Sequence, residues 1–235
     1  MAYQILVVDD EKLIVKGIKF SLEQDGMEVT AAYDGEEALQ NIKEKNFDLV
    51  VLDVMLPKMD GLEVCQQTRE FSQVPIIMVT AKGEDMDKIM GLEYGADDYI
   101  TKPFTPMELM ARVNSQLRRY HRFLDRLNSK QTENPKVHRL GGLEVNEETV
   151  EVTVDDKTVK VTPIEFKILL LLIQNPGRVF PAEEIYERVW NERAVNTDTV
   201  MVHIRNLREK IEVNPREPKY VKVVWGVGYK IEKQP

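Results

Sequence analysis

Five polar residues follow short apolar runs at points where they could act on a phosphate group. They are the acidic residues Asp9, Asp10 and Asp53, together with Thr80 and Lys102. Three carboxylates brought together raise one another's pKa unless a cation lies among them, which indicates a divalent ion. Oxygen ligands suit Mg²⁺, which takes one or two carboxylates plus phosphate oxygens. Lys102 adds a point charge and Thr80 a hydroxyl, the groups that a phosphoryl group needs.

A simpler explanation is that acidic residues end strands because they favour turns. We prefer a binding site, because five suitable residues end four different apolar runs.

The first 120 residues must position this set. Continuous or nearly continuous apolar runs indicate buried strands, at residues 5–8, 27–32, 49–52, 76–79 and 99–100. Amphipathic stretches of helical spacing lie between and after them, at residues 13–24, 36–45, 62–71, 85–94 and 106–119. This alternation predicts an α/β fold, a doubly wound parallel five-stranded sheet of the flavodoxin-like kind, whose ligands bind at the carboxyl ends of the strands.

Composition narrows the class of protein. No apolar run approaches the roughly 20 residues of a membrane span, so we expect a cytoplasmic protein without a membrane partner. The single cysteine, Cys65, excludes an intramolecular disulfide and a cysteine-rich zinc site, and its neighbours predict a packed thiol. Residues 1–120 carry a net charge of −9, whereas residues 195–235 hold 8 basic and 5 acidic residues. Nucleic acid is therefore expected to bind only near the C-terminus.

The chain divides at a polar segment. Residues 121–137 show little sustained periodicity and are rich in turn-forming residues near 128–135, which predicts a flexible linker. A helical continuation to about residue 127 stays open. We expect one domain at residues 1–120, the linker at 121–137 and a second domain at 138–235.

The second domain reads as short strands, then helices, then a hairpin. Strands are predicted at residues 143–145, 149–154 and 158–161. Thr162, Pro163 and Glu165 form a capping-box pattern at a helix start. Further elements are the apolar helical run 166–173, helices at 181–190 and 197–213, and a hairpin at 220–231. Three helices followed by a hairpin predict an α+β winged helix-turn-helix domain.

The third of these helices would read DNA. Val200, Ile204, Leu207 and Ile211 recur at helical spacing and should face the core. The candidate DNA contacts lie off this stripe or on the hairpin, and they are His203, Arg205, Asn206, Arg208, Lys222 and Lys230. On an isolated helix such charges would equally well form a solvated face, but here the order of helices favours DNA.

The motifs of the first domain resemble the receiver domains of two-component response regulators. They are LVVDDE at residues 6–11, LDVMLP at 52–57, DG at 60–61, VTAK at 79–82 and GADDYITKPF at 95–104. The resemblance implies that Asp53 is the phosphoacceptor and that Asp9, Asp10, Asp53 and the main-chain carbonyl of Met55 bind Mg²⁺. It further implies that Lys102 and Thr80 contact the phosphoryl group and that Tyr99 is an aromatic switch.

The same resemblance implies partners. A sensor histidine kinase would donate the phosphoryl group, and the chain would hydrolyse its aspartyl phosphate slowly without being an enzyme in the metabolic sense. Phosphorylation would promote a homodimer through three ion pairs, Lys88 with Glu108, Asp98 with Arg112 and Asp97 with Arg119. Double-stranded promoter DNA and RNA polymerase are the further partners implied.

The second domain resembles the winged-helix output of the OmpR/PhoB-like subfamily, through VTPIEF at 161–166, VMVHIRNLR at 200–208 and GVGY at 226–229. Its ending, from residue 214, is most similar to the vancomycin-resistance regulator branch. Trp225, Asp198 and Asn206 stand where other members have arginine, so the operator cannot be transferred from a relative. Stimulus, kinase, and activation or repression are likewise not encoded in these motifs.

Two other classes fit less well. A phosphohydrolase with an aspartyl intermediate needs a second acid two residues after its nucleophile, whereas Val54 and Met55 follow Asp53. A dinucleotide-binding fold needs a glycine-rich turn after its first strand, and residues 9–11 are acidic instead.

Overall fold

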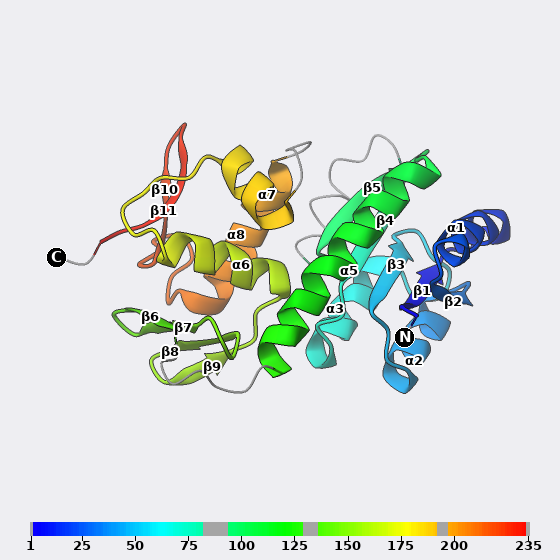
Figure 1. Cartoon of the computed structure of the whole chain (residues 1–235), viewed down its shortest axis with the longest axis horizontal. Coiled ribbons are helices and arrows are strands. Elements are labelled where there is room, and N and C mark those ends of the chain that lie inside the picture. The colour runs from blue at the N-terminus through cyan, green and yellow to red at the C-terminus, as the bar shows by residue number, and fades with distance from the viewer. Residues whose placement is uncertain (1, 82–93, 129–135, 192–196, 234–235) are drawn as a thin grey trace. The chain divides into compact units, whose positions relative to one another are not determined.

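The computed structural model describes residues 2–81, 94–128, 136–191 and 197–233, and only the backbone of 122–128 (Figure 1). The chain forms two compact units, Met1–Tyr120 and His121–Pro235, which are taken separately below. Among the described residues, no helix is both long and apolar enough to cross a membrane.

The first unit is built on a five-stranded parallel sheet in the order β2-β1-β3-β4-β5 (Figure 1). Its strands are β1 (Gln4–Val8), β2 (Glu28–Ala32), β3 (Leu49–Asp53), β4 (Ile76–Ala81) and β5 (Asp98–Lys102). The helices are α1 (Lys12–Gln24), α2 (Gly35–Glu44), α3 (Gly61–Phe71) and α5 (Pro106–Asn128). The predicted doubly wound sheet is therefore confirmed. The predicted helix at residues 85–94 falls, apart from Tyr94, outside the described residues.

Alternation along the buried strands divides the core between two faces of the sheet. Ile5 and Val7 on β1 pack in one cluster with Ile18 of α1 and with Leu109 and Val113 of α5. On the other side, α2 and α3 pack against each other. Cys65 of α3 has no exposed surface, and burial raises the pKa of its thiol to about 11, as expected of a packed cysteine.

Helix α5 corrects part of the linker prediction. It continues to Asn128, so residues 121–128 are helical and the continuation that the sequence left open is present. Arginine and leucine, both good helix formers, make up half of these residues.

The second unit begins with a four-stranded antiparallel sheet in the order β6-β7-β8-β9. Its strands are β6 (Val137–Leu140), β7 (Leu143–Asn146), β8 (Glu151–Val154) and β9 (Lys157–Val159). Strand β6 was missed, because its sequence VHRL places only two apolar residues in four and starts inside the segment that we predicted as linker.

Three helices and a hairpin follow. They are α6 (Pro163–Ile173), α7 (Ala182–Trp190), α8 (Asp198–Ile211), β10 (Val221–Val224) and β11 (Gly228–Ile231). The winged helix is thus confirmed, and so is the capping box, in which Thr162 Oγ1 accepts from Glu165 N while Glu165 Oε2 accepts from Thr162 N. Glu165 is fully buried and also binds Lys210 Nζ at 2.7 Å, which ties α6 to α8.

The hairpin, called the wing below, is fixed to the body of the second unit. The backbones of Phe180 and Tyr229 exchange two hydrogen bonds. Gly228 allows this approach, because a Cβ there would collide with the carbonyl of Phe180. The predicted apolar stripe of α8 faces the core, since Val200, Ile204, Leu207 and Ile211 are all at most 2% exposed.

Candidate functional site

The carboxyl ends of two neighbouring strands, β1 and β3, bring the acidic residues together. Asp9 follows β1 and Asp53 ends β3, and both are buried, whereas the neighbouring Asp10 is exposed. One carboxylate oxygen from each of the three residues lies within 4.8 Å of the others. We call these residues, with Lys102, the acidic pocket.

Lys102, at the end of β5, reaches into the acidic pocket. Its Nζ lies 2.7 Å from Asp9 Oδ2 and 2.8 Å from Asp53 Oδ2, with Glu11 Oε1 further away at 3.8 Å. Burial opposes the charge of Lys102, but hydrogen bonds to Asp53 and Asp9 outweigh it and raise the pKa of the ammonium group. The lysine therefore stays charged between the two buried carboxylates.

Asp53 keeps an excess of negative charge around it. Burial raises the pKa of its carboxyl, and the contact with Lys102 offsets only part of this effect. The single ammonium group of Lys102 thus lies beside three carboxylates, of which Asp9 and Asp53 are buried and Asp10 is exposed. Hard oxygen donors with uncompensated charge are the set that Mg²⁺ prefers, so these residues fit that ion.

Thr80, Met55 and Tyr99 are the other residues predicted at this site. Thr80 is 1% exposed on β4, one residue beyond Val79, the register partner of Asp53. Within the described part of the chain, its hydroxyl has no hydrogen-bond partner. Met55 donates its backbone N–H to Asp53 Oδ1 at 3.4 Å, and Tyr99 is 9% exposed on β5.

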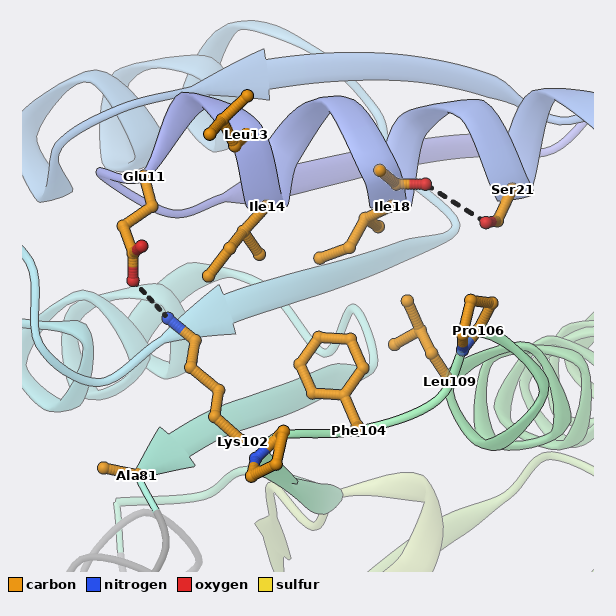
Figure 2. Close-up of a pocket in the computed structure, with 12 residues that line it drawn as sticks. Glu11, Leu13, Ile14, Ile18, Ser21, Ala81, Lys102, Phe104, Pro106 and Leu109 are labelled. Carbon is orange, nitrogen blue, oxygen red and sulfur yellow. Dashed lines mark hydrogen bonds and ion pairs between the residues drawn. The ribbon is translucent and has the colours of Figure 1, made fainter.

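An apolar groove adjoins the acidic pocket, and Figure 2 shows it between α1 and the segment that follows β5. The cavity has a volume of about 550 Å³ and is lined on one side by Ile14, Gly17 and Ile18 of α1. Phe104 and Leu109 line the other side, and the contact between Glu11 and Lys102 closes one end. Sequence reasoning did not find this groove, because its walls lie far apart in the chain.

The residues expected at a dimer interface are paired within one chain. Arg112 Nη1 contacts both carboxylate oxygens of Asp98, at 2.9 and 3.0 Å, and Arg112 Nη2 lies 4.0 Å from Glu108. Arg119 donates to Ser115 Oγ at 2.6 Å. Lys88 lies outside the described residues.

Asp97 has an unexpected neighbour, Arg69 of α3. Arg69 Nη2 lies 2.8 Å from Asp97 Oδ2, and the same oxygen accepts from the backbone N–H of Ile76. Asp97 is 1% exposed, so this contact joins α3 to the starts of β4 and β5. No periodicity in the sequence points to Arg69, since a single arginine near a helix end is ordinary.

The six candidate DNA contacts differ in their surroundings. The side chain of Arg205 is 61% exposed and lies 3.5 Å from Glu209. Arg208 instead donates its Nε–H to the carbonyl of Val221 at 2.9 Å and lies over the ring of Tyr229, so it holds α8 to the wing. Burial lowers the pKa of its guanidinium, which nonetheless stays charged.

The remaining four candidates are less available than the sequence suggested. His203 and Asn206 are 1% and 6% exposed, and the His203 ring lies 5.5 Å from that of Trp190. Lys222 and Lys230 both contact Glu232. The most exposed aromatic residue of the wing is Trp225, which is 88% exposed at the turn between β10 and β11.

Comparison with known proteins agrees with this geometry. The family described as "Response regulator receiver domain" matches residues 5–114, and "Transcriptional regulatory protein, C terminal" matches residues 156–231. An acidic pocket in a receiver and a winged helix that binds DNA together define the class of response regulators.

Relatives cover the whole chain. "Regulatory protein VanRc" of Enterococcus gallinarum is 48% identical over 99% of this chain and 100% of its own length. "Alkaline phosphatase synthesis transcriptional regulatory protein PhoP" of Bacillus subtilis (strain 168) is 45% identical over 99% and 98%. The solved structure of a RitR mutant has the same fold, with a TM-score of 0.78 at 23% identity, covering 99% of this chain and 100% of that one. The chain belongs to the two-component response regulators with an OmpR/PhoB-type output domain.

Proposed function

We propose that Asp53 accepts a phosphoryl group in the acidic pocket and that this modification controls DNA binding by the second unit. The observation that carries the proposal is the position of the Asp53 carboxylate, which lies at the end of a buried strand, 2.8 Å from Lys102 and within 4.8 Å of two more carboxylates. Asp9, Asp10 and Asp53 would hold Mg²⁺, together with the carbonyl of Met55. When bound, the ion neutralises the charge of the incoming group and aligns it.

The residues of the chain then have distinct tasks. An Asp53 oxygen forms a bond to phosphorus while the bond from phosphorus to the donor nitrogen breaks, and the donor imidazole leaves with the electron pair. Lys102 turns from the carboxylates to the phosphoryl oxygens, and the hydroxyl of Thr80 donates to another of these oxygens. Tyr99, on the strand that carries Lys102, would respond to this change. Slow hydrolysis of the resulting anhydride resets the switch, so the chain acts as a regulator and not as a metabolic enzyme.

A test of the acceptor uses intact-protein mass spectrometry. The chain, incubated with acetyl phosphate and Mg²⁺, should gain one base-labile phosphoryl group, and removal of Mg²⁺ by a chelator should prevent this. Asp53→Asn should gain none, because the amide is not a nucleophile. Asp10→Asn is a matched control at an exposed position that should slow uptake without moving its site. Normal labelling of the Asp53→Asn chain would contradict the assignment.

We infer that the phosphodonor, a sensor histidine kinase, contacts the apolar groove. A phosphohistidine can reach Asp53 only if its protein covers the neighbouring surface, where Leu13 is 85% exposed beside the groove. Gly17 offers a clean probe, because an added Cβ would meet nothing within 4 Å. Gly17→Leu should fill the groove and slow transfer from the kinase, while uptake from acetyl phosphate stays unchanged. Equal slowing of both would indicate a distorted pocket instead.

Phosphorylation should promote a homodimer of the first unit. Asp98 and Arg112 would exchange their contact within the chain for the same contact with a second copy. Glu108 would pair with Lys88 of that copy, and Asp97 with Arg119. Because the Asp98–Arg112 contact is replaced by an equal one, it contributes little affinity and mainly sets the register of the dimer. Arg112→Glu should weaken the dimer and Asp98→Arg in addition should partly restore it. Sedimentation showing equal dimerisation in all variants would remove these pairs from the mechanism.

The output unit would bind promoter DNA in the cytoplasm, where it meets RNA polymerase. Two copies should occupy half-sites about 10–11 base pairs apart. Arg205 is the candidate for reading bases. Genome-wide mapping of bound DNA with and without phosphorylation would identify the operators and the direction of regulation.

A further inference from the structure

Two lysines of the wing lie directly opposite each other. Lys222 on β10 and Lys230 on β11 are partners in the antiparallel register. Like charges in this position destabilise a hairpin. Glu232 relieves the repulsion, because its Oε2 lies 2.9 Å from Lys222 Nζ and its Oε1 lies 3.1 Å from Lys230 Nζ. Each oxygen of one carboxylate is thus held by a different ammonium group. We call these three residues the wing triad.

The wing triad lies on the outer face of the hairpin. Val221 and Ile231, which precede Lys222 and follow Lys230, are fully buried in the core. Because side chains alternate along a strand, the two lysines point away from that core. The side chains of Lys222, Lys230 and Glu232 are 39%, 26% and 49% exposed, so an outside anion can reach the site. Hydrogen bonds from both lysines lower the pKa of Glu232, which keeps its carboxylate charged.

We propose that the carboxylate of Glu232 occupies the place of a DNA backbone phosphate and that DNA binding displaces it. A phosphodiester presents two non-bridging oxygens that share one negative charge, as does the carboxylate that Lys222 and Lys230 now hold. The proposal rests on the proposed function, DNA binding by the second unit, and on the predicted DNA contacts of Lys222 and Lys230. Displacement breaks two ion pairs and leaves Glu232 beside the negative backbone. Glu232 therefore weakens DNA binding by the wing, and does so alike for every sequence.

The decisive variant is Glu232→Gln, which removes the charge and keeps the shape of the side chain. Binding of the full chain to a labelled duplex pool of random sequence is measured by fluorescence anisotropy at several salt concentrations. The dissociation constant should fall by about threefold to tenfold at low salt, and the dependence of affinity on salt should steepen by up to about one charge.

Glu217→Gln is the matched control. It makes the same change in net charge on the same unit, but its carboxylate accepts a hydrogen bond from Asn214 and forms no ion pair with a lysine of the described residues. Its effect on affinity should be clearly smaller. Equal effects of the two variants would mean that only net charge matters, and would overturn the proposal.

A second variant guards against a merely structural role. In a Lys222→Met background, Glu232→Gln should change affinity less than in the native chain, because half of the anion site is gone. Thermal unfolding is followed for every variant. If Glu232→Gln lowers the melting temperature and leaves the dissociation constant unchanged, Glu232 serves the hairpin alone and the proposal fails. Failure of the native chain to bind any DNA at low salt would instead contradict the proposed function itself.

Discussion

The acidic pocket and the candidate DNA contacts of the second unit differ in how their residues are placed. In the pocket, Asp9, Asp53 and Lys102 are attached to the ends of buried parallel strands, so the main chain brings them to one edge of the sheet. In the second unit, Arg208 and Lys222 have long side chains that could reach several neighbours. Arg208 donates a hydrogen bond to the carbonyl of Val221, and Lys222 forms an ion pair with Glu232. Side chains attached to the ends of buried strands are thus placed by the sheet, whereas long side chains on the surface of the second unit can pair with more than one neighbour.

Removal of Lys102 should give the largest effect in this comparison. Lys102→Ala leaves two buried carboxylates without their cation, so phosphoryl uptake should slow by about tenfold to a hundredfold, or about 1.4–2.8 kcal/mol in activation free energy. Raising the Mg²⁺ concentration should recover part of the rate, because the ion then offsets the carboxylate charges that Lys102 offsets in the native chain. Stopped-flow fluorescence at several Mg²⁺ concentrations measures both. A rate independent of Lys102 would show that the ion pairs around it play no part.

Arg208 should behave as a structural residue. Arg208→Ala removes the hydrogen bond to Val221 and the contact with Tyr229, so the free energy of unfolding should fall by about 1–3 kcal/mol. DNA affinity should fall equally for all sequences, because the wing loses its support. Chemical denaturation and binding to an operator library test the two parts, and Arg208→Lys should recover little, since the Nε–H is missing. A change in base preference with native stability would make Arg208 a direct reader.

Arg205 should show the opposite pattern. Its side chain is 61% exposed and its contact with Glu209 is a weak surface pair. Arg205→Ala should leave stability within about 0.5 kcal/mol of native and reduce discrimination at one or two base pairs by about 1–3 kcal/mol. Selection from a randomised duplex library measures the discrimination. Unchanged base preference would exclude Arg205 as the reading residue.

The smallest effect expected is at the tip of the wing. Trp225 is 88% exposed whereas the second tryptophan, Trp190, is fully buried, so DNA contact with the wing should quench or shift the emission of Trp225 alone. Trp225→Phe should abolish this signal and change affinity by about 1 kcal/mol or less. A signal that survives in Trp225→Phe would locate the change near Trp190 instead.

The difference between buried strands and surface side chains also decides how much of the fold could be predicted from the sequence. The runs at 5–8, 49–52 and 76–79 predicted three central strands, because burial on both faces demands continuous apolar residues. The capping box at Thr162 was predicted from three residues of local pattern. Strand β6 was not predicted, since only half of its residues are apolar and its pairing with β7 defines it.

The contacts of the candidate sites could likewise be predicted only in part. Convergence of Asp9, Asp53 and Lys102 needs only the topology of the sheet, which periodicity predicts. The contacts of Arg69 with Asp97, of Arg208 with Val221 and of Glu232 with the two lysines join residues without any shared period. Only one signal was present for these, namely that two lysines opposite each other in a hairpin call for an anion.

The extension of α5 to Asn128 shortens the segment that joins this helix to the strands and helices of the output domain. Only residues 129–136 separate the end of this helix from β6, and at about 3.3–3.6 Å per residue they span at most about 29 Å. A short tether raises the effective concentration of the second output unit once the first is bound, and lowers it sharply when half-sites lie beyond reach. Insertion of flexible residues after Asn128 should therefore lower the affinity for closely spaced half-sites. It should also allow binding to half-sites that lie further apart.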